Sequence, residues 1–104
     1  MLMVPYEPAE AELRVANSRF IARLAPASTV EEAKDFIASV RRAHADATHN
    51  VPAFIIGGGN TVTEFCSDDG EPAGTSGRPL LATLKGSGFG NVVVVVTRYF
   101  GGTL

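Results

Sequence analysis

Five consecutive valines, Val92 to Val96, constrain the fold of this chain more than any other feature. Branching at Cβ stiffens a valine side chain and favours extended backbone, so the run predicts a strand. Neighbouring residues of a strand point to opposite faces of the sheet. A run that is apolar throughout therefore predicts a central strand that is covered on both faces.

Apolar and polar residues alternate in two short stretches that follow an irregular lead-in over residues 1–10. Such alternation predicts half-buried strands. Asn17 and Ser18 interrupt the pattern, which is compatible with a hairpin or with one bent strand. Two more strands are predicted over residues 51–56 and 62–66, with a glycine-rich turn between them. The apolar positions of the first two strands are Leu13, Val15, Phe20, Ala22 and Leu24.

Two helices are predicted between these strands. The first spans Thr29 to about Ala45, because Ser28 and Thr29 precede glutamates in overlapping capping-box patterns. Its apolar side is formed by Ala33, Ile37, Val40 and His44. The second helix begins near Pro79, a residue suited to a first helical turn, and ends at Gly86 to Gly88.

This order of elements predicts an α+β fold: a mixed, mainly antiparallel sheet with two helices on one face. A chain of 104 residues has room for one core, so we expect a single domain over residues 11–104. No cofactor is expected. The net charge of −2 disfavours a domain that grips nucleic acid mainly through phosphates.

Several features predict a cytoplasmic protein without a membrane segment. The longest apolar runs are far shorter than the ~20 residues that a membrane-spanning helix needs. Residues 1–6 lack the basic start and apolar stretch of a secretion signal. The single cysteine, Cys66, has no partner for an internal disulfide and is interpreted as a small strand residue.

A dense polar loop over residues 67–77 precedes the second helix. Its glycines and hydroxyls, followed by Arg78, stand at a helix start, where main-chain N–H groups favour a phosphate or sulfate. The alternative is that Thr75 or Ser76 only caps the helix, while the glycines serve the turn. The predicted binding residues in this region are Asp68, Asp69, Glu71, Gly74, Thr75, Ser76, Gly77 and Arg78.

The acidic residues of this loop allow two further interpretations. Their spacing does not match a regular calcium-binding loop, so no metal site is predicted, and acids in such loops more often accept main-chain hydrogen bonds. His49, Ser76 and Asp68 or Asp69 are the residue types of a hydrolytic triad. Without a Gly-x-Ser-x-Gly motif, His49, Asp69 and Ser76 remain catalytic candidates by residue type only.

The residues after the valine run offer a second set of binding groups. Arg98 and Tyr99 could stack on a base or on a partner's side chain, since arginine and aromatic residues dominate binding hot spots. The alternative places Phe100 in the core and Tyr99 at a sheet edge. His49 is interpreted as a hydrogen-bonding residue before the third strand, and His44 as a satisfied core histidine.

The stretch from Asp68 to Pro79 resembles the YigZ/Impact family, and supporting matches span about residues 15–104. The matching segments are Ser18-Arg19-Phe20, His44 with Ala47, His49 and Asn50, and Val96-Thr97-Arg98-Tyr99-Phe100-Gly101-Gly102. The resemblance implies a fold like the second domain of ribosomal protein S5. It also implies a regulatory binding domain linked to translation initiation, with a translation-machinery protein or structured RNA as partner. In this hypothesis the Asp68 to Arg78 loop and a turn over Arg98 to Gly102 form one binding face.

A different class of function is also compatible with the residues. An enzyme acting on a phosphorylated or nucleotide-like small molecule would seat phosphate at Gly74 to Arg78 and use His49 or Asp69 as acid or base. The resemblance further implies a C-terminal continuation that this sequence lacks after Leu104. We therefore expect an uncovered apolar surface and a homodimer that buries Phe100 or Leu104.

Overall fold

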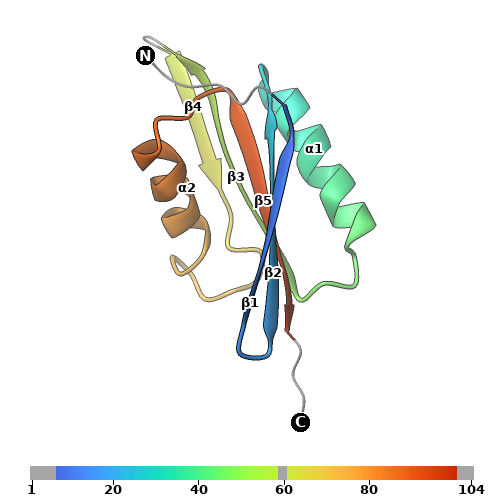
Figure 1. Ribbon diagram of the computed structural model, residues 1–104. Coiled ribbons are helices and arrows are strands. Elements are labelled where there is room, and N and C mark those ends of the chain that lie inside the picture. Colours follow the sequence, from blue (N-terminus) through green and yellow to red (C-terminus); the bar gives the residue numbers. More distant parts are fainter. Residues whose placement is uncertain (1–6, 59–60, 101–104) are drawn as a thin grey trace.

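The computed structural model describes residues 7–58 and 61–100, which form a five-stranded sheet and two helices (Figure 1). The predicted turn at Gly101 and Gly102, and Leu104, lie outside the described residues. The sheet order is β1-β2-β5-β3-β4. The elements are β1 (Ala9–Val15), β2 (Ser18–Pro26), α1 (Val30–Ala43), β3 (His49–Gly58), β4 (Thr61–Cys66), α2 (Gly77–Gly86) and β5 (Val92–Phe100).

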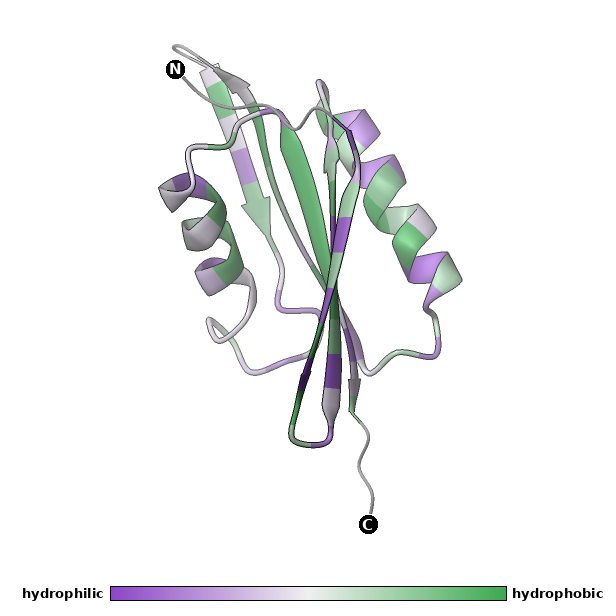
Figure 2. Cartoon of the chain, viewed as in Figure 1, coloured by the Kyte–Doolittle hydropathy of each residue, from purple (hydrophilic) through white to green (hydrophobic). Residues whose placement is uncertain are grey.

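The valine run forms the middle strand of the sheet, as the sequence predicts. β5 pairs with β2 on one side and with β3 on the other. Val92, Val93 and Val95 are each 0% exposed, and Val94 is 4% exposed. Figure 2 shows the valine run of β5 as a continuous hydrophobic segment between the two helices. The core is therefore built on both faces of β5.

The two helices cover opposite faces of the sheet, which corrects the prediction that they share one face (Figure 1). α1 packs against Val93 and Val95, whereas α2 packs against Val92 and Val94. The physical reason is the valine run itself. Alternate valines point to opposite faces, and each face needs its own apolar cover.

The sheet is antiparallel at every pairing of the described strands. This confirms the predicted mainly antiparallel sheet and corrects only the expectation that some of its strands pair in parallel. Both β2 and β3 run antiparallel to β5 and hence parallel to each other. They do not pair because β5 lies between them. Direct pairing of β2 with β3 would have been parallel and would have made the sheet mixed, but β5 separates them.

A tight hairpin joins β1 and β2, and it settles the alternative that the sequence leaves open. Val15 pairs with Ser18, so only Ala16 and Asn17 form the turn. Ala16 has a positive φ of 51°, as hairpin turns of two residues require. β1 is exposed along its whole length, contrary to the predicted half-burial, because it is the outermost strand on its side of the sheet.

The capping pattern at the start of α1 forms as predicted. The Thr29 hydroxyl accepts from the Glu32 main-chain N–H at 3.1 Å, and the Glu32 carboxylate accepts from the Ser28 N–H at 2.7 Å. Ala33, Ile37 and Val40 are buried against the sheet. The helix ends at Ala43, so His44 is its C-cap rather than a residue of its apolar face.

Candidate functional site

The polar loop between β4 and α2 is organised by Asp68. Its carboxylate accepts hydrogen bonds from the main-chain N–H groups of Gly74 at 2.8 Å, Ser76 at 3.1 Å and Gly77 at 2.8 Å. These bonds, with that of Gly77 the largest, lower the pKa of Asp68 below its ordinary value. Asp68 therefore supplies the negative charge that this helix start attracts.

This geometry disfavours an anion site at the helix start and corrects the alternative that Thr75 or Ser76 caps it. The N–H groups predicted to hold phosphate or sulfate are directed to Asp68, so an external anion would have to displace that carboxylate. Ser76 is the N-cap residue, but its side chain makes no capping hydrogen bond. The Thr75 hydroxyl instead donates to the Pro72 carbonyl oxygen. Asp68, eight residues before Ser76, thus caps the helix in place of Thr75 or Ser76.

Gly77 is required by the close approach of α2 to the loop. A Cβ at this position would lie 2.6 Å from the carbonyl oxygen of Ser67. That separation is shorter than any ordinary van der Waals contact, so only glycine allows the helix to begin here. The first turn of α2 is consequently pinned against the end of β4.

The second acid of the loop, Asp69, connects it to the start of β3. The Nδ1 of His49 lies 2.7 Å from the main-chain carbonyl oxygen of Asp69. A carbonyl oxygen only accepts, so Nδ1 carries the hydrogen. The Asp69 carboxylate accepts from the Asn50 N–H at 2.6 Å and lies 3.7 Å from Arg41. This agrees with the interpretation of His49 as a hydrogen-bonding residue before the third strand.

These contacts do not assemble a hydrolytic triad from the candidate residues. His49 contacts the Asp69 main chain rather than its carboxylate, and the Ser76 hydroxyl donates to Glu71 Oε1 at 2.5 Å. Asp68 is held by three N–H groups of the loop. The hydroxyl, imidazole and carboxylate that acyl transfer would need are each bonded to a different partner.

Glu71 connects the loop to the end of β5. Its Oε2 accepts from Nη1 of Arg98 at 2.9 Å, and the Glu71 side chain is only 13% exposed. Arg98 also donates from Nη2 to the Ser18 hydroxyl at 3.4 Å. The sequence predicted that the loop and Arg98 share one face, and the ion pair brings them together as predicted.

Arg98 stands at the mouth of a small cavity on the α2 side of the sheet. Its guanidinium lies 5.6 Å from the ring centroids of both Phe20 and Phe100. Its Nε is buried and has no hydrogen-bond partner among the described residues. The cavity has a volume of about 170 Å³, and we call it the Arg98 cavity. Its lining residues are Phe20, Val51, Glu71, Ser76, Leu80, Val96 and Arg98.

Tyr99 and Arg78, two other predicted binding residues, lie elsewhere. Tyr99 follows Arg98 in β5 and so points to the opposite face. Its hydroxyl donates to Asp46 at 3.1 Å and lies 2.7 Å from Nδ1 of His44, which must therefore donate to it. Partial burial, followed by the bond to Asp46, raises the pKa of Tyr99. Arg78 is exposed on α2 and lines a shallow hollow beside β4.

The apolar walls of the Arg98 cavity are the site residues that the sequence analysis missed. Phe20 and Val51 come from β2 and β3, Leu80 from α2 and Val96 from β5. Alternation places Val96 and Arg98 on the same face of β5, and this spacing was the available signal. No group of three or more His, Cys, Asp or Glu residues able to hold a metal ion occurs within residues 7–58 and 61–100. Neither described helix has the length and apolar character needed to cross a membrane.

Fold and site together define a small antiparallel α+β domain with a polar cluster and a side-chain-sized cavity at one end of its central strand. Residues 16–104 match the family model described as the Impact N-terminal domain. The chain belongs to the Impact family. It is 46% identical over 103 residues to the IMPACT family member YigZ of Escherichia coli K12, covering 98% of this chain and 50% of that protein.

More distant relatives and solved structures agree with this assignment. Protein IMPACT of Mus musculus is 37% identical over 92 residues, covering 85% of this chain and 28% of the mouse protein. A crystal structure of a hypothetical protein matches with a TM-score of 0.92 and 45% identity, covering 99% of this chain and 50% of that one. This match confirms the predicted α+β fold. The chain therefore spans about half the length of the bacterial relatives that it matches.

A second solved structure that matches is described as that of the two-domain translational regulator Yih1. Its TM-score is 0.63 at 23% identity, and the match covers 92% of this chain and 36% of Yih1. At that identity the likeness is one of fold.

Proposed function

We propose that this domain is a binding module of a protein that regulates translation, and that it receives its partner at the Arg98 cavity. Membership of the Impact family supports the class of function, as does the described role of Yih1 as a translational regulator. The observation that carries the proposal is the buried Nε of Arg98, a donor without an acceptor beside a small cavity.

A buried donor without an acceptor is costly and is often explained by a partner that supplies one. The Arg98 guanidinium is already oriented by Glu71 and by two aromatic rings, so little side-chain entropy is lost on binding. A partner that places a carbonyl or carboxylate oxygen beside Nε would supply the missing acceptor. Arginine and aromatic residues held in this way are typical of binding hot spots.

The size of the cavity favours a macromolecular partner. A volume of about 170 Å³ is below the ~300 Å³ at which small-molecule pockets usually begin. It is large enough for one side chain or part of a base. The partner we propose is accordingly a translation-machinery protein or structured RNA. The alternative enzyme on phosphorylated substrates has less support, because Asp68 already occupies the N–H groups that would bind phosphate.

Co-sedimentation with purified ribosomal subunits, and separately with their protein-free RNA, tests the proposal. Arg98→Lys keeps the positive charge but removes Nε and the planar guanidinium that lies over the Phe20 ring. We expect the parent domain to sediment with subunits and the variant to lose at least about tenfold in affinity, the loss that one hot-spot residue typically gives. Arg14→Lys on exposed β1 is the matched control.

The RNA arm assigns the partner. Binding to the protein-free RNA identifies structured RNA, and binding only to whole subunits identifies a protein. A parent domain that sediments with neither, or an Arg98→Lys variant that keeps its fold and binds like the parent, would contradict the proposal.

A further inference from the structure

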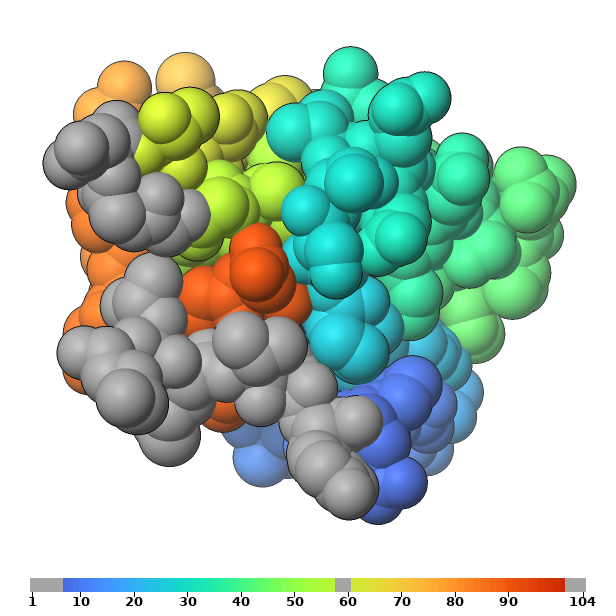
Figure 3. Space-filling model, turned by 90° about the horizontal axis from the view of Figure 1, so that it is seen from above, coloured from blue at the N-terminus to red at the C-terminus, as the bar shows by residue number. Residues whose placement is uncertain are grey.

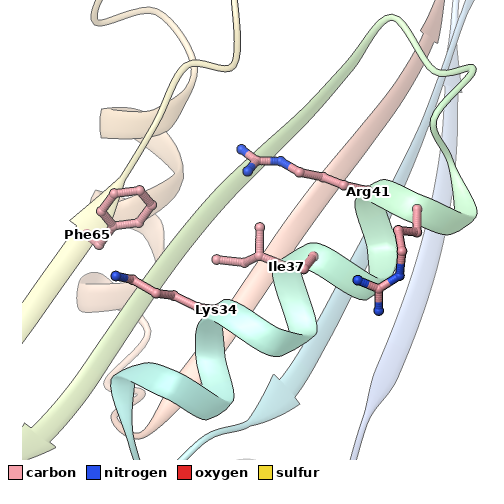
Figure 4. Close-up of a pocket in the computed structure, with 6 residues that line it drawn as sticks. Lys34, Ile37, Arg41 and Phe65 are labelled. Atoms are coloured by element: carbon pink, nitrogen blue, oxygen red, sulfur yellow. The ribbon is translucent and has the colours of Figure 1, made fainter.

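A second hollow lies on the opposite face of the sheet from the Arg98 cavity, between α1 and the outermost strand β4. Its volume is about 440 Å³. Figure 4 shows Lys34, Ile37 and Arg41 of α1 reaching toward Phe65 of β4. We call it the α1–β4 groove, and its lining residues are Lys34, Ile37, Ala38, Arg41, Arg42 and Phe65.

The groove has an apolar floor and a basic rim. Lys34, Ile37 and Arg41 are three and four residues apart, which places them along one side of the helix. Phe65 stacks on the buried Phe54 with 5.1 Å between ring centroids, so its ring is held in place while 39% of the residue stays exposed. An apolar side chain that settled between Ile37 and Phe65 would lie between cationic groups.

The charges of the rim are largely uncompensated. Lys34 and Arg42 form no ion pair with any residue in the described ranges, and Arg41 has only a long contact of 3.7 Å with Asp69. Among the acids of α1, Glu32 is used in the helix cap, and Glu31 and Asp35 form no ion pair with any described residue. Three cations within about two and a half turns of helix favour an anionic ligand.

The groove runs beside the free edge of the sheet. β4 pairs only with β3, so its other side has no strand neighbour among the described residues. Five of its six residues are exposed. Figure 3 shows the surface of α1 beside that of the β3–β4 hairpin. A free edge offers main-chain N–H and C=O groups to an extended segment of another chain.

We propose that the α1–β4 groove binds an extended acidic segment of a partner protein, which adds as a strand along β4. Side chains on one face of that segment reach the groove: an apolar residue contacts Phe65 and Ile37, and flanking carboxylates pair with Lys34 and Arg41. The free strand edge and the apolar floor favour a peptide over RNA, because RNA has no peptide N–H and C=O groups to pair with β4. The net charge of −2 also disfavours a nucleic-acid surface.

Amide chemical shifts of the domain, titrated with short synthetic peptides, test this site. The probe peptide has glutamate, leucine and glutamate at every second position, with threonine between them, so that the leucine and both carboxylates lie on one face of a strand. A second peptide has lysine in place of every glutamate. A third carries N-methyl groups on alternate amides, which blocks strand pairing but leaves the side chains. We expect saturable shifts in residues 34–42 and 61–66 with the first peptide only.

Charge reversal at the rim supplies the matched variants. Lys34→Glu should weaken binding of the acidic peptide by about tenfold or more, as reversal at a charged interface usually does. Arg14→Glu on the distant strand β1 makes the same charge change and should leave binding unaltered. Lys34 has no ion pair to lose among the described residues, so the variant should fold like the parent.

Three results would overturn the proposal: no shifts with the acidic peptide, equal binding of the lysine and glutamate peptides, or binding by the N-methylated peptide. Binding of a short single-stranded RNA at the same residues, with the acidic peptide inactive, would also overturn it and identify a nucleic-acid surface. The site does not depend on the Arg98 cavity. Arg98→Lys should therefore bind the acidic peptide like the parent, so the two proposals fail separately.

Discussion

Glu71 and Arg98 lie 27 residues apart in the chain, yet a 2.9 Å ion pair joins them at the end of the central strand. The pair is largely shielded from water, with side-chain exposures of 13% and 31%. Glu71 also accepts the Ser76 hydroxyl, so one carboxylate connects β5 to the start of α2. This link positions the Arg98 cavity and is the first target for mutation.

Glu71→Gln should destabilise the domain by about 1–3 kcal/mol, because it removes a charge from a shielded pair and leaves Arg98 uncompensated. Urea denaturation measures the change. Glu12→Gln is the control, since Glu12 and Arg19 form a pair of the same 2.9 Å length with both side chains about 40% exposed. Water screens that pair, and its loss should be clearly smaller. Equal losses would show that burial of the Glu71 pair is unimportant.

Stability should fall in acid through Asp68. Main-chain hydrogen bonds to the ionised carboxylate lower its pKa in the folded domain, so the unfolded chain takes up the proton first. The stabilisation is complete above the ordinary pKa of the carboxyl group and is lost as the pH falls through the lowered, folded-state pKa.

Asp68→Ala should therefore melt lower than the parent at neutral pH and show a weaker loss of melting temperature on acidification. The amides of Gly74, Ser76 and Gly77 should exchange faster with solvent. Asp35→Ala, on α1, should melt and respond to acid like the parent. An Asp68→Ala variant with the parent's acid response would refute the capping role.

Two glycines at opposite ends of α2 should respond to alanine with opposite signs. Gly77→Ala should cost about 1–3 kcal/mol, because its Cβ would meet the Ser67 carbonyl oxygen at 2.6 Å. Gly86→Ala should be neutral or stabilise by up to about 1 kcal/mol, because nothing lies within 4 Å of its Cβ and alanine favours helix. Thermal melts of the two variants measure these changes in stability. A Gly77→Ala variant as stable as the parent would disprove the close approach of Gly77 to the Ser67 carbonyl oxygen.

The β1–β2 end of the sheet should promote self-association. Leu13 and Val15 are 61% and 52% exposed, and Phe100 is 57% exposed. The strand register places all three side chains on the face of the sheet that carries α2. On that face α2 covers β3, β4 and the start of β5, but it does not reach these three residues. An apolar patch of this kind favours pairing of identical surfaces, so we expect a reversible dimer.

Light scattering across a wide concentration range measures that equilibrium. Leu13→Glu should shift it to the monomer, whereas Val62→Glu, on the far strand β4, should not. A parent domain that stays monomeric throughout the range would rule out this dimer.

The features that the sequence predicted correctly are those set by local physical chemistry. The valine run has an apolar residue at every position, and only a central strand with cover on both faces buries such a segment. The capping pattern at Thr29 and Glu32 lies within one helical turn, so its geometry follows from spacing alone. The link between Arg98 and the polar loop was also predicted, from the family resemblance and from the residue types.

Other features depend on contacts between distant segments, which residue spacing does not encode. Alternation shows that β5 needs cover on both faces, but it does not say which helix supplies each cover. The helix start at Gly77 attracts a negative charge, and only the path of the chain shows that Asp68 provides it rather than a bound anion. The tertiary structure likewise left β1 exposed. Burial depends on which element packs over a face of the sheet, and the alternation of side chains along a strand does not determine that.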